Sequence, residues 1–205
     1  LLEEACESMA FNLKELGYTA HAMHNNTGTF YNRNIVYGSL GFDTFEPIVY
    51  MSNITRYFMG WANDSMLTSE ILSTLNSTEG PDFVYAISVQ LHGKYPSEPI
   101  EGAPVIRVTG VEDEAERNAY EYYLGQLHQV DSFLSALVNR LSMRDEPTVL
   151  VFYGDHLPSL ALNAEQFTRS TLFQTEYLIW ANYELPKQDR DLHSYQLGAY
   201  VLQRL

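Results

Sequence analysis

The stretch of residues 148–158, with the sequence TVLVFYGDHLP, constrains the fold of this chain more than any other. Its first six residues are β-branched, aliphatic or aromatic and carry no charge, which predicts a strand buried on both faces, as in a parallel sheet. The strand ends before Gly154, Asp155 and His156, and Pro158 prevents a simple continuation. In open α/β sheets, ligands bind at the carboxyl ends of strands. This turn therefore delivers a carboxylate and an imidazole to a ligand-binding position; the alternative is an Asp that caps a turn beside a packed His.

Histidines also follow two other predicted strands. Residues 18–23 form a short apolar run that leads to His24, and residues 83–89 form a second run that leads to His92. Arg33 follows shortly after the first of them. Parallel strands present their carboxyl ends along one edge of a sheet, so we expect these side chains and the Asp155–His156 pair to meet there.

Helical patterns separate and follow the predicted strands. We expect helices over residues 2–16, 30–40, 65–76 (with Asp64 as N-cap), 112–142 and 195–205, a short helix and loop over 163–173, and a further strand over 177–181. Residues 42–63 are predicted to be irregular. The alternation predicts an α/β fold with a mostly parallel central sheet flanked by helices, in one domain over residues 1–205. The chain opens on Leu1 with a helical pattern already running, so we expect the fold to be incomplete at its N-terminus.

Charge and composition exclude several classes of function. The net charge is −14, from 26 acidic and 12 basic residues, which disfavours nucleic acid as a partner because phosphate backbones bind to basic faces. The single cysteine, Cys6, excludes an internal disulfide and a thiolate metal cluster. No Walker loop, GxGxxG loop or GxSxG elbow is present.

The residue types at the strand ends favour a metal-assisted reaction on an anionic substrate. Asp155 and His156 suit Mn²⁺, Mg²⁺ or Zn²⁺. Two ligands are fewer than the three protein ligands that a catalytic metal usually has, so the others are expected from upstream. Arg33 offers a planar set of donors that matches a phosphate or a carboxylate.

The series of motifs resembles the lipoteichoic acid synthase family, phosphoglycerol transferases of the sulfatase and alkaline-phosphatase-like superfamily. The matching segments are His24, FYNR at 30–33, LGFD at 40–43, His92–Gly93 and FYGDHLP at 152–158. The resemblance covers the C-terminal part of the family's extracellular catalytic domain. It implies a domain anchored to a bacterial cell membrane by helices upstream of residue 1. It also implies transfer of glycerol phosphate from phosphatidylglycerol to a growing cell-envelope polymer or glycolipid, through a phosphothreonine intermediate.

The resemblance also assigns roles to residues. It implies that Asp155 and His156 bind Mn²⁺ or Mg²⁺, with Zn²⁺ less favoured, and that the nucleophilic Thr and a Glu ligand precede Leu1. Residues 1–205 alone are then expected to be inactive. The implied contacts to the head group are His24, Asn26, Tyr31, Arg33 and His92. Tyr31 replaces a Trp and Asn26 an acidic residue that are frequent in the family, so the exact head group stays open.

Three alternatives remain at this point. The chain could belong to a phosphoethanolamine transferase or a sulfatase, to a phosphatase of the same superfamily that hydrolyses its substrate, or to a non-catalytic module that binds anionic polymers.

Overall fold

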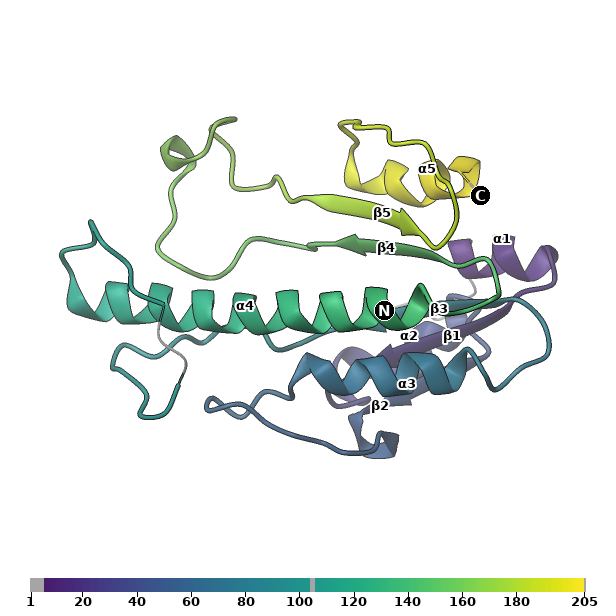
Figure 1. The fold of residues 1–205 in the computed structure, drawn as a ribbon, viewed down its shortest axis with the longest axis horizontal. Helices are drawn as coiled ribbons and strands as arrows, with labels where there is room; N and C mark the ends of the chain where they lie inside the picture. Colours follow the sequence, from purple (N-terminus) through teal and green to yellow (C-terminus); the bar gives the residue numbers. More distant parts are fainter. Residues whose placement is uncertain (1–5, 104–105, 205) are drawn as a thin grey trace. The chain divides into compact units, whose positions relative to one another are not determined.

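The structure is a computed structural model that describes residues 6–103 and 106–204. The chain divides into two compact units, unit 1 (residues 1–133) and unit 2 (residues 134–205). The α/β class expected from the sequence is confirmed in the arrangement of strands and helices (Figure 1).

Unit 1 contains a three-stranded parallel sheet in the order β2-β1-β3. The strands are β1 (Thr19–His24), β2 (Thr44–Pro47) and β3 (Asp82–Ile87). β1 is central and pairs in parallel with both neighbours, so that His24 lies opposite Pro47 on one side and Ile87 on the other. Five consecutive residues of β1 are buried, as expected for a central strand covered on both faces. The carboxyl ends of the three strands therefore meet at one edge.

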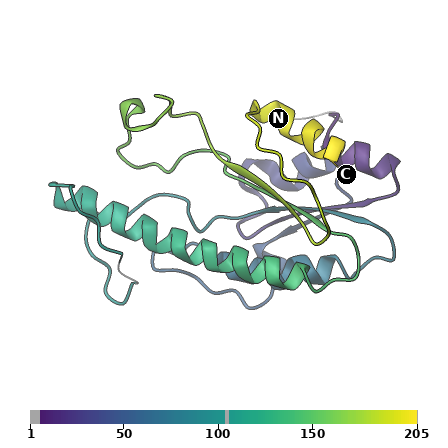
Figure 2. The ribbon, with the colours of Figure 1, turned by 45° about the horizontal axis from the view of Figure 1, so that its top comes forward.

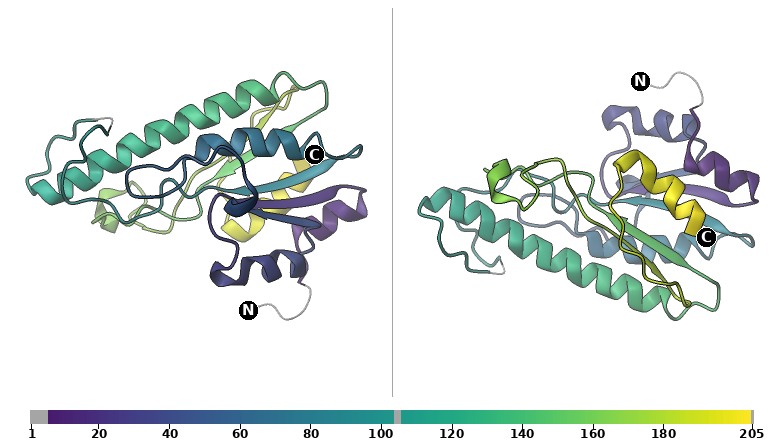
Figure 3. Two further views of the ribbon diagram at one scale, coloured as in Figure 1. Left: turned by 90° about the horizontal axis from the view of Figure 1, so that it is seen from below. Right: turned by 90° about the horizontal axis from the view of Figure 1, so that it is seen from above.

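Helices cover both faces of this sheet. Figures 2 and 3 show α1 (Met9–Glu15) and α2 (Arg33–Ser39) on one face and α3 (Leu67–Thr74) on the other. The long helix α4 (Glu114–Leu141) contributes its residues up to Phe133 to unit 1, and Val130 and Phe133 are buried. The layers bury a core that includes Leu13, Met23 and Leu67.

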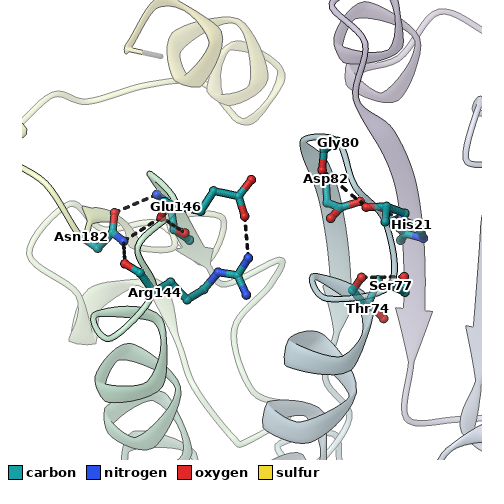
Figure 4. A network of polar contacts seen from close by, with 10 residues as sticks. His21, Thr74, Ser77, Gly80, Asp82, Arg144, Glu146 and Asn182 are labelled. Carbon is teal, nitrogen blue, oxygen red and sulfur yellow. Dashed lines mark hydrogen bonds and ion pairs between the residues drawn. The ribbon is translucent and has the colours of Figure 1, made fainter.

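The amino end of the same sheet is held by a buried polar cluster. The Nδ1 atom of His21 lies 2.8 Å from Thr44 Oγ1, and its Nε2 atom lies 3.1 Å from Asp82 Oδ1. Thr78 donates its hydroxyl to the same Asp82 oxygen at 2.6 Å. Figure 4 shows His21 facing Asp82 between β1 and β3. This cluster ties the three strands together at the edge opposite to His24.

Unit 2 contains a two-stranded antiparallel sheet. β4 (Val149–Tyr153) pairs with β5 (Tyr177–Ala181), and α5 (Leu197–Arg204) follows. The side chain of Asn182 supports the entry to β4, because its Oδ1 atom accepts a bond from Thr148 N at 2.8 Å and its Nδ2 atom donates to the carbonyl oxygens of Arg144 and Glu146 (Figure 4).

Three local predictions were wrong. The apolar run of β4 was expected to be a strand of a parallel sheet buried on both faces, but it pairs antiparallel with β5, and Phe152 and Tyr153 are exposed. The region 42–63 was expected to be irregular, but residues 44–47 form β2 because β1 offers them a partner. Asp64 was expected to cap a helix, but Asn63 precedes the first turn and the Asp64 side chain is used elsewhere, as described below.

The helices are also shorter than expected. α1 begins at Met9 rather than at residue 2, because Ser8 has extended backbone and its hydroxyl accepts a bond from the amide of Ala10, which is N-cap geometry. Residues 2–5 of the predicted helix lie outside the described residues. Cys6 precedes α1 and is exposed. Within residues 6–103 and 106–204, no helix combines the length and apolar character that crossing a membrane requires.

Candidate functional site

His24 is the last residue of β1 and the most buried of the predicted head-group residues, with 4% of its surface exposed. Its Nδ1 atom lies 2.9 Å from the carbonyl oxygen of Ile87 on β3. A carbonyl can only accept, so Nδ1 carries the proton and Nε2 is left as an acceptor in the neutral ring. Burial, followed by the positive charge of Arg33, lowers the pKa of His24 to about 4. The ring is therefore neutral at physiological pH.

His92 follows β3 and is exposed. Its amide donates to the carbonyl of Val89 at 2.9 Å, and its Nδ1 atom lies 2.6 Å from the carbonyl oxygen of Gly93. The ring also packs against Trp61, with 5.0 Å between the ring centroids. As in His24, the Nδ1 atom is bound to the backbone and Nε2 is presented. His92 also contributes to the lowered pKa of His24.

Arg33 begins α2 and is partly exposed. Its Nη1 atom donates to the carbonyl of Thr27 at 2.9 Å, and its guanidinium carbon lies 5.3 Å from the centroid of the Phe30 ring. Backbone and ring together restrain the guanidinium, while its other N–H groups have no acceptor among the hydrogen bonds of the described residues. The positive charge of Arg33 helps to lower the pKa of His24, so it favours the neutral form of that ring.

Asn26 and Tyr31 lie on the loop between β1 and α2. The Oδ1 atom of Asn26 accepts a bond from the amide of Thr27 at 2.7 Å. The backbone carbonyl of Asn26 accepts a bond from Ile48 N at 3.1 Å. Tyr31 has a left-handed backbone (φ 58°) and is 72% exposed, with its ring 4.3 Å from that of Phe30. Both residues precede Arg33 on the segment that leads from β1 to α2.

Asp155 and His156 follow β4 in unit 2. Asp155 Oδ1 and His156 Nε2 lie 3.7 Å apart, and both side chains are largely exposed. The Nδ1 atom of His156 lies 2.8 Å from the carbonyl oxygen of Leu157, so Nε2 is free to bind a metal. A carboxylate and an oriented imidazole on the same side of a turn fit two positions of a Mn²⁺, Mg²⁺ or Zn²⁺ shell. Within the part of the chain that the structure describes, no group of three or more His, Cys, Asp or Glu residues could hold a metal.

A buried polar network behind the head-group residues was not predicted. Asp64 has no exposed surface, and its Oδ1 atom accepts a bond from Asn25 Nδ2 at 2.7 Å. The same oxygen accepts bonds from the amides of Val89 and Gln90. Burial raises the pKa of Asp64, and these hydrogen bonds oppose the shift. No local pattern could have indicated this role, because the partners of Asp64 lie 25 to 39 residues away in the sequence.

Comparison with known proteins places this chain in a family. A profile of the Sulfatase family matches residues 2–203. The chain is 29% identical over 197 residues to a protein of Rhizobium meliloti named for cyclic beta-1,2-glucan modification, which covers 89% of this chain and 30% of that protein. It is 25% identical over 198 residues to lipoteichoic acid synthase 2 of Bacillus subtilis, which covers 94% of this chain and 29% of that protein. The chain thus spans less than a third of the length of these relatives.

Solved structures agree with the fold. The phosphoglycerol transferase GacH of Streptococcus pyogenes, solved in complex with sn-glycerol-1-phosphate, superimposes with a TM-score of 0.68 at 26% identity, over 84% of this chain and 46% of GacH. The periplasmic domain of EptC from Escherichia coli, solved in complex with Zn, gives a TM-score of 0.60 at 19% identity, over 94% of this chain and 54% of that domain. The match over residues 2–203, together with the similarity to lipoteichoic acid synthases noted in the sequence, shows that this chain belongs to the Sulfatase family.

Proposed function

We propose that this chain is part of a metal-dependent phosphotransferase that moves glycerol phosphate from phosphatidylglycerol to a cell-envelope polymer or glycolipid. The protein that contains it is held at a bacterial membrane with this domain outside the cell. The nucleophilic Thr and a Glu ligand are supplied from outside residues 1–205. The similarity to a lipoteichoic acid synthase and to a phosphoglycerol transferase solved with sn-glycerol-1-phosphate supports this assignment.

The residues at the carboxyl edge of the parallel sheet bind the head group. The N–H groups of Arg33 that are not bound to Thr27 donate to the phosphate. The neutral ring of His24 accepts a hydrogen bond at Nε2 from a glycerol hydroxyl, because its Nδ1 proton is committed to Ile87. His92 presents its Nε2 atom in the same way, and Asn26 and Tyr31 border the site.

In the complete protein, Asp155 and His156 would hold a divalent cation, which we expect to be Mn²⁺ or Mg²⁺. When bound, such a cation lowers the pKa of the attacking hydroxyl and stabilises charge on the transferring phosphoryl group. The role of His156 is to present Nε2, which its bond to Leu157 keeps unprotonated in the neutral ring.

The observation that carries the proposal is the buried ring of His24 at the carboxyl end of β1, held by Ile87 and close enough to Arg33 for its charge to help lower the pKa of His24. One fixed cation beside a neutral imidazole suits an anionic ester with hydroxyl groups, which describes a glycerol phosphate head group. A module that only binds anionic polymers would use the same residues but would transfer nothing.

The test is a transfer assay on the complete protein that contains residues 1–205, with Mn²⁺ and vesicles that hold phosphatidylglycerol as donor and a glycolipid as acceptor of the glycerol phosphate. Wild-type protein should release diacylglycerol, and Arg33→Ala should lower the rate by about 10- to 100-fold, the cost of losing a charge-assisted contact of this kind. Arg56→Ala is the matched control, because Arg56 Nη1 donates to the Gly60 carbonyl at 2.9 Å as Arg33 does to Thr27. Binding of vesicles without release of diacylglycerol would identify a binding module, and release of free glycerol phosphate would identify a hydrolase.

A further inference from the structure

The two histidines of the proposed head-group site come from segments that are far apart in the sequence. His24 ends β1, and His92 lies in the segment that follows β3. The bond from His24 Nδ1 to Ile87 joins β1 to β3 within the sheet. Beyond Ile87 the ladder ends, so the path from β3 to His92 needs other contacts to fix its position.

Asp64 supplies these contacts from a third segment. Its Oδ1 atom accepts bonds from Asn25 Nδ2 at 2.7 Å, Val89 N at 3.2 Å and Gln90 N at 3.3 Å. Asn25 is the residue after His24, and Val89 is the residue whose carbonyl accepts the amide of His92. Asp64 Oδ1 is therefore linked to His24 through the side chain of the next residue, Asn25. It is linked to His92 through Val89, which donates its amide to Asp64 and accepts the amide of His92.

The segment around Asp64 is itself held in place. The amide of Asp64 donates to Gln90 Oε1 at 2.8 Å, and Gln90 Nε2 donates to Gln126 and Gln129 of α4 at 3.0 Å each. Gln129 donates in turn to the hydroxyl of Tyr57 at 2.9 Å. Asn25 and Gln126 are each only 1% exposed, whereas Gln129 and Tyr57 at the outer end of the connection are partly buried.

A buried carboxylate is costly unless hydrogen bonds compensate it, and Asp64 Oδ1 accepts three such bonds. We propose that Asp64 is a positioning residue for the head-group site: its carboxylate holds the segment of His24 and the segment of His92 in one fixed relation. The effect of Asp64 on substrate binding rests on the proposed function. Its effect on the positions of His24 and His92 does not. Displacement of catalytic or binding groups by about 1 Å can cost about 100-fold in rate.

The experiment compares Asp64→Ala with Asp82→Ala in the complete protein. Asp82 is a matched control, because its carboxylate is buried in unit 1 like that of Asp64. It is bonded to His21 at the opposite edge of the sheet, away from His24 and His92. Folding is checked by circular dichroism and thermal melting. We expect both variants to have a lower melting temperature than the wild-type protein. Only Asp64→Ala should lower kcat/KM for phosphatidylglycerol, by about 10- to 100-fold and mainly through KM, with the bound metal unchanged.

A second readout does not depend on activity. NMR spectra of the histidine ring protons should show the His24 and His92 signals displaced in Asp64→Ala and unchanged in Asp82→Ala, which should instead move His21. Asp64→Asn keeps an oxygen acceptor in the same place and should recover most of the activity and the wild-type signals.

Each result bears on the inference. If Asp64→Ala only melts earlier, and its kinetics and His24 and His92 signals match those of Asp82→Ala, then Asp64 is merely structural and the inference fails. If wild-type protein shows no transfer, the proposed function fails and the NMR comparison alone decides the role of Asp64. If Asp64→Ala does not fold, Asn25→Ala, which removes one of the three bonds, replaces it, and an unchanged His24 signal overturns the inference.

Discussion

The Nδ1 atom of His24 donates to the carbonyl of Ile87 across 2.9 Å, from the last residue of one strand to the last residue of its parallel neighbour. The bond fixes which ring nitrogen carries the proton. His92 and His156 use the same arrangement with the carbonyls of Gly93 and Leu157. All three histidines singled out by the sequence therefore present Nε2, which is the arrangement expected of imidazoles that accept hydrogen bonds or bind a metal.

The burial of His24 makes stability depend on pH. Its pKa is about 4 in the folded protein, against an ordinary value of 6.5. Between these values the unfolded chain binds more protons, so stability is full above pH 6.5 and declines as the pH falls toward 4. Urea unfolding at pH 7 and pH 4.5 should show a smaller pH-dependent loss in His24→Gln than in wild type. Exposed His128 on α4 provides the control variant, His128→Gln, and an equal loss in wild type and His24→Gln would contradict the prediction.

Arg33 and His24 should be coupled electrostatically. Arg33→Gln removes the cation that helps to lower the pKa of His24, so that pKa should rise above about 4 in an NMR titration. Arg56→Gln should leave it unchanged. Arg33→Lys keeps the charge but loses the planar set of donors, so the His24 pKa should stay low while KM for phosphatidylglycerol rises about tenfold or more. A normal KM in Arg33→Lys would mean that a point charge is sufficient.

Asp155 should be required for metal binding. Asp155→Ala in the complete protein should lose bound Mn²⁺, measured by elemental analysis after dialysis, and should abolish transfer. Asp189→Ala is the control, because Asp189 is similarly exposed, at 83% against 79% for Asp155, and pairs only with nearby Lys187 at 3.2 Å among the ion pairs of the described residues. Retention of both metal and activity in Asp155→Ala would remove Asp155 from the proposed metal centre.

Asn182 should stabilise unit 2. Its side chain satisfies one backbone amide and two backbone carbonyls at the entry to β4, so Asn182→Ala should lower the free energy of unfolding by about 1–3 kcal/mol. Asn139, exposed on α4, provides the comparison, and Asn139→Ala should have little effect. The measurement is urea unfolding followed by circular dichroism. Equal unfolding curves for the two variants would show that solvent replaces the three bonds of Asn182 without cost.

Local patterns predicted most of the elements. The apolar run before His24 identified β1 and the run from Tyr177 identified β5, because such runs need no distant partner to be recognised. The edge strand β2 was missed because four residues among scattered aromatics carry no period, and only pairing with β1 makes them a strand. The prediction that β4 pairs in parallel was wrong for a related reason. An uncharged apolar run indicates a strand, but its partner decides whether the pair is parallel or antiparallel.

The sequence by itself determined the α/β class, the family resemblance and the chemical groups of the candidate site, because strand ends, residue types and motif spacing are local properties of the chain. Only the tertiary structure decided which nitrogen each histidine presents, that Arg33 and His92 act on His24, and that Asp64 serves two strand ends instead of capping a helix. These features depend on burial and on hydrogen bonds between segments as much as 63 residues apart, and a buried polar group takes whichever partner the fold brings to it.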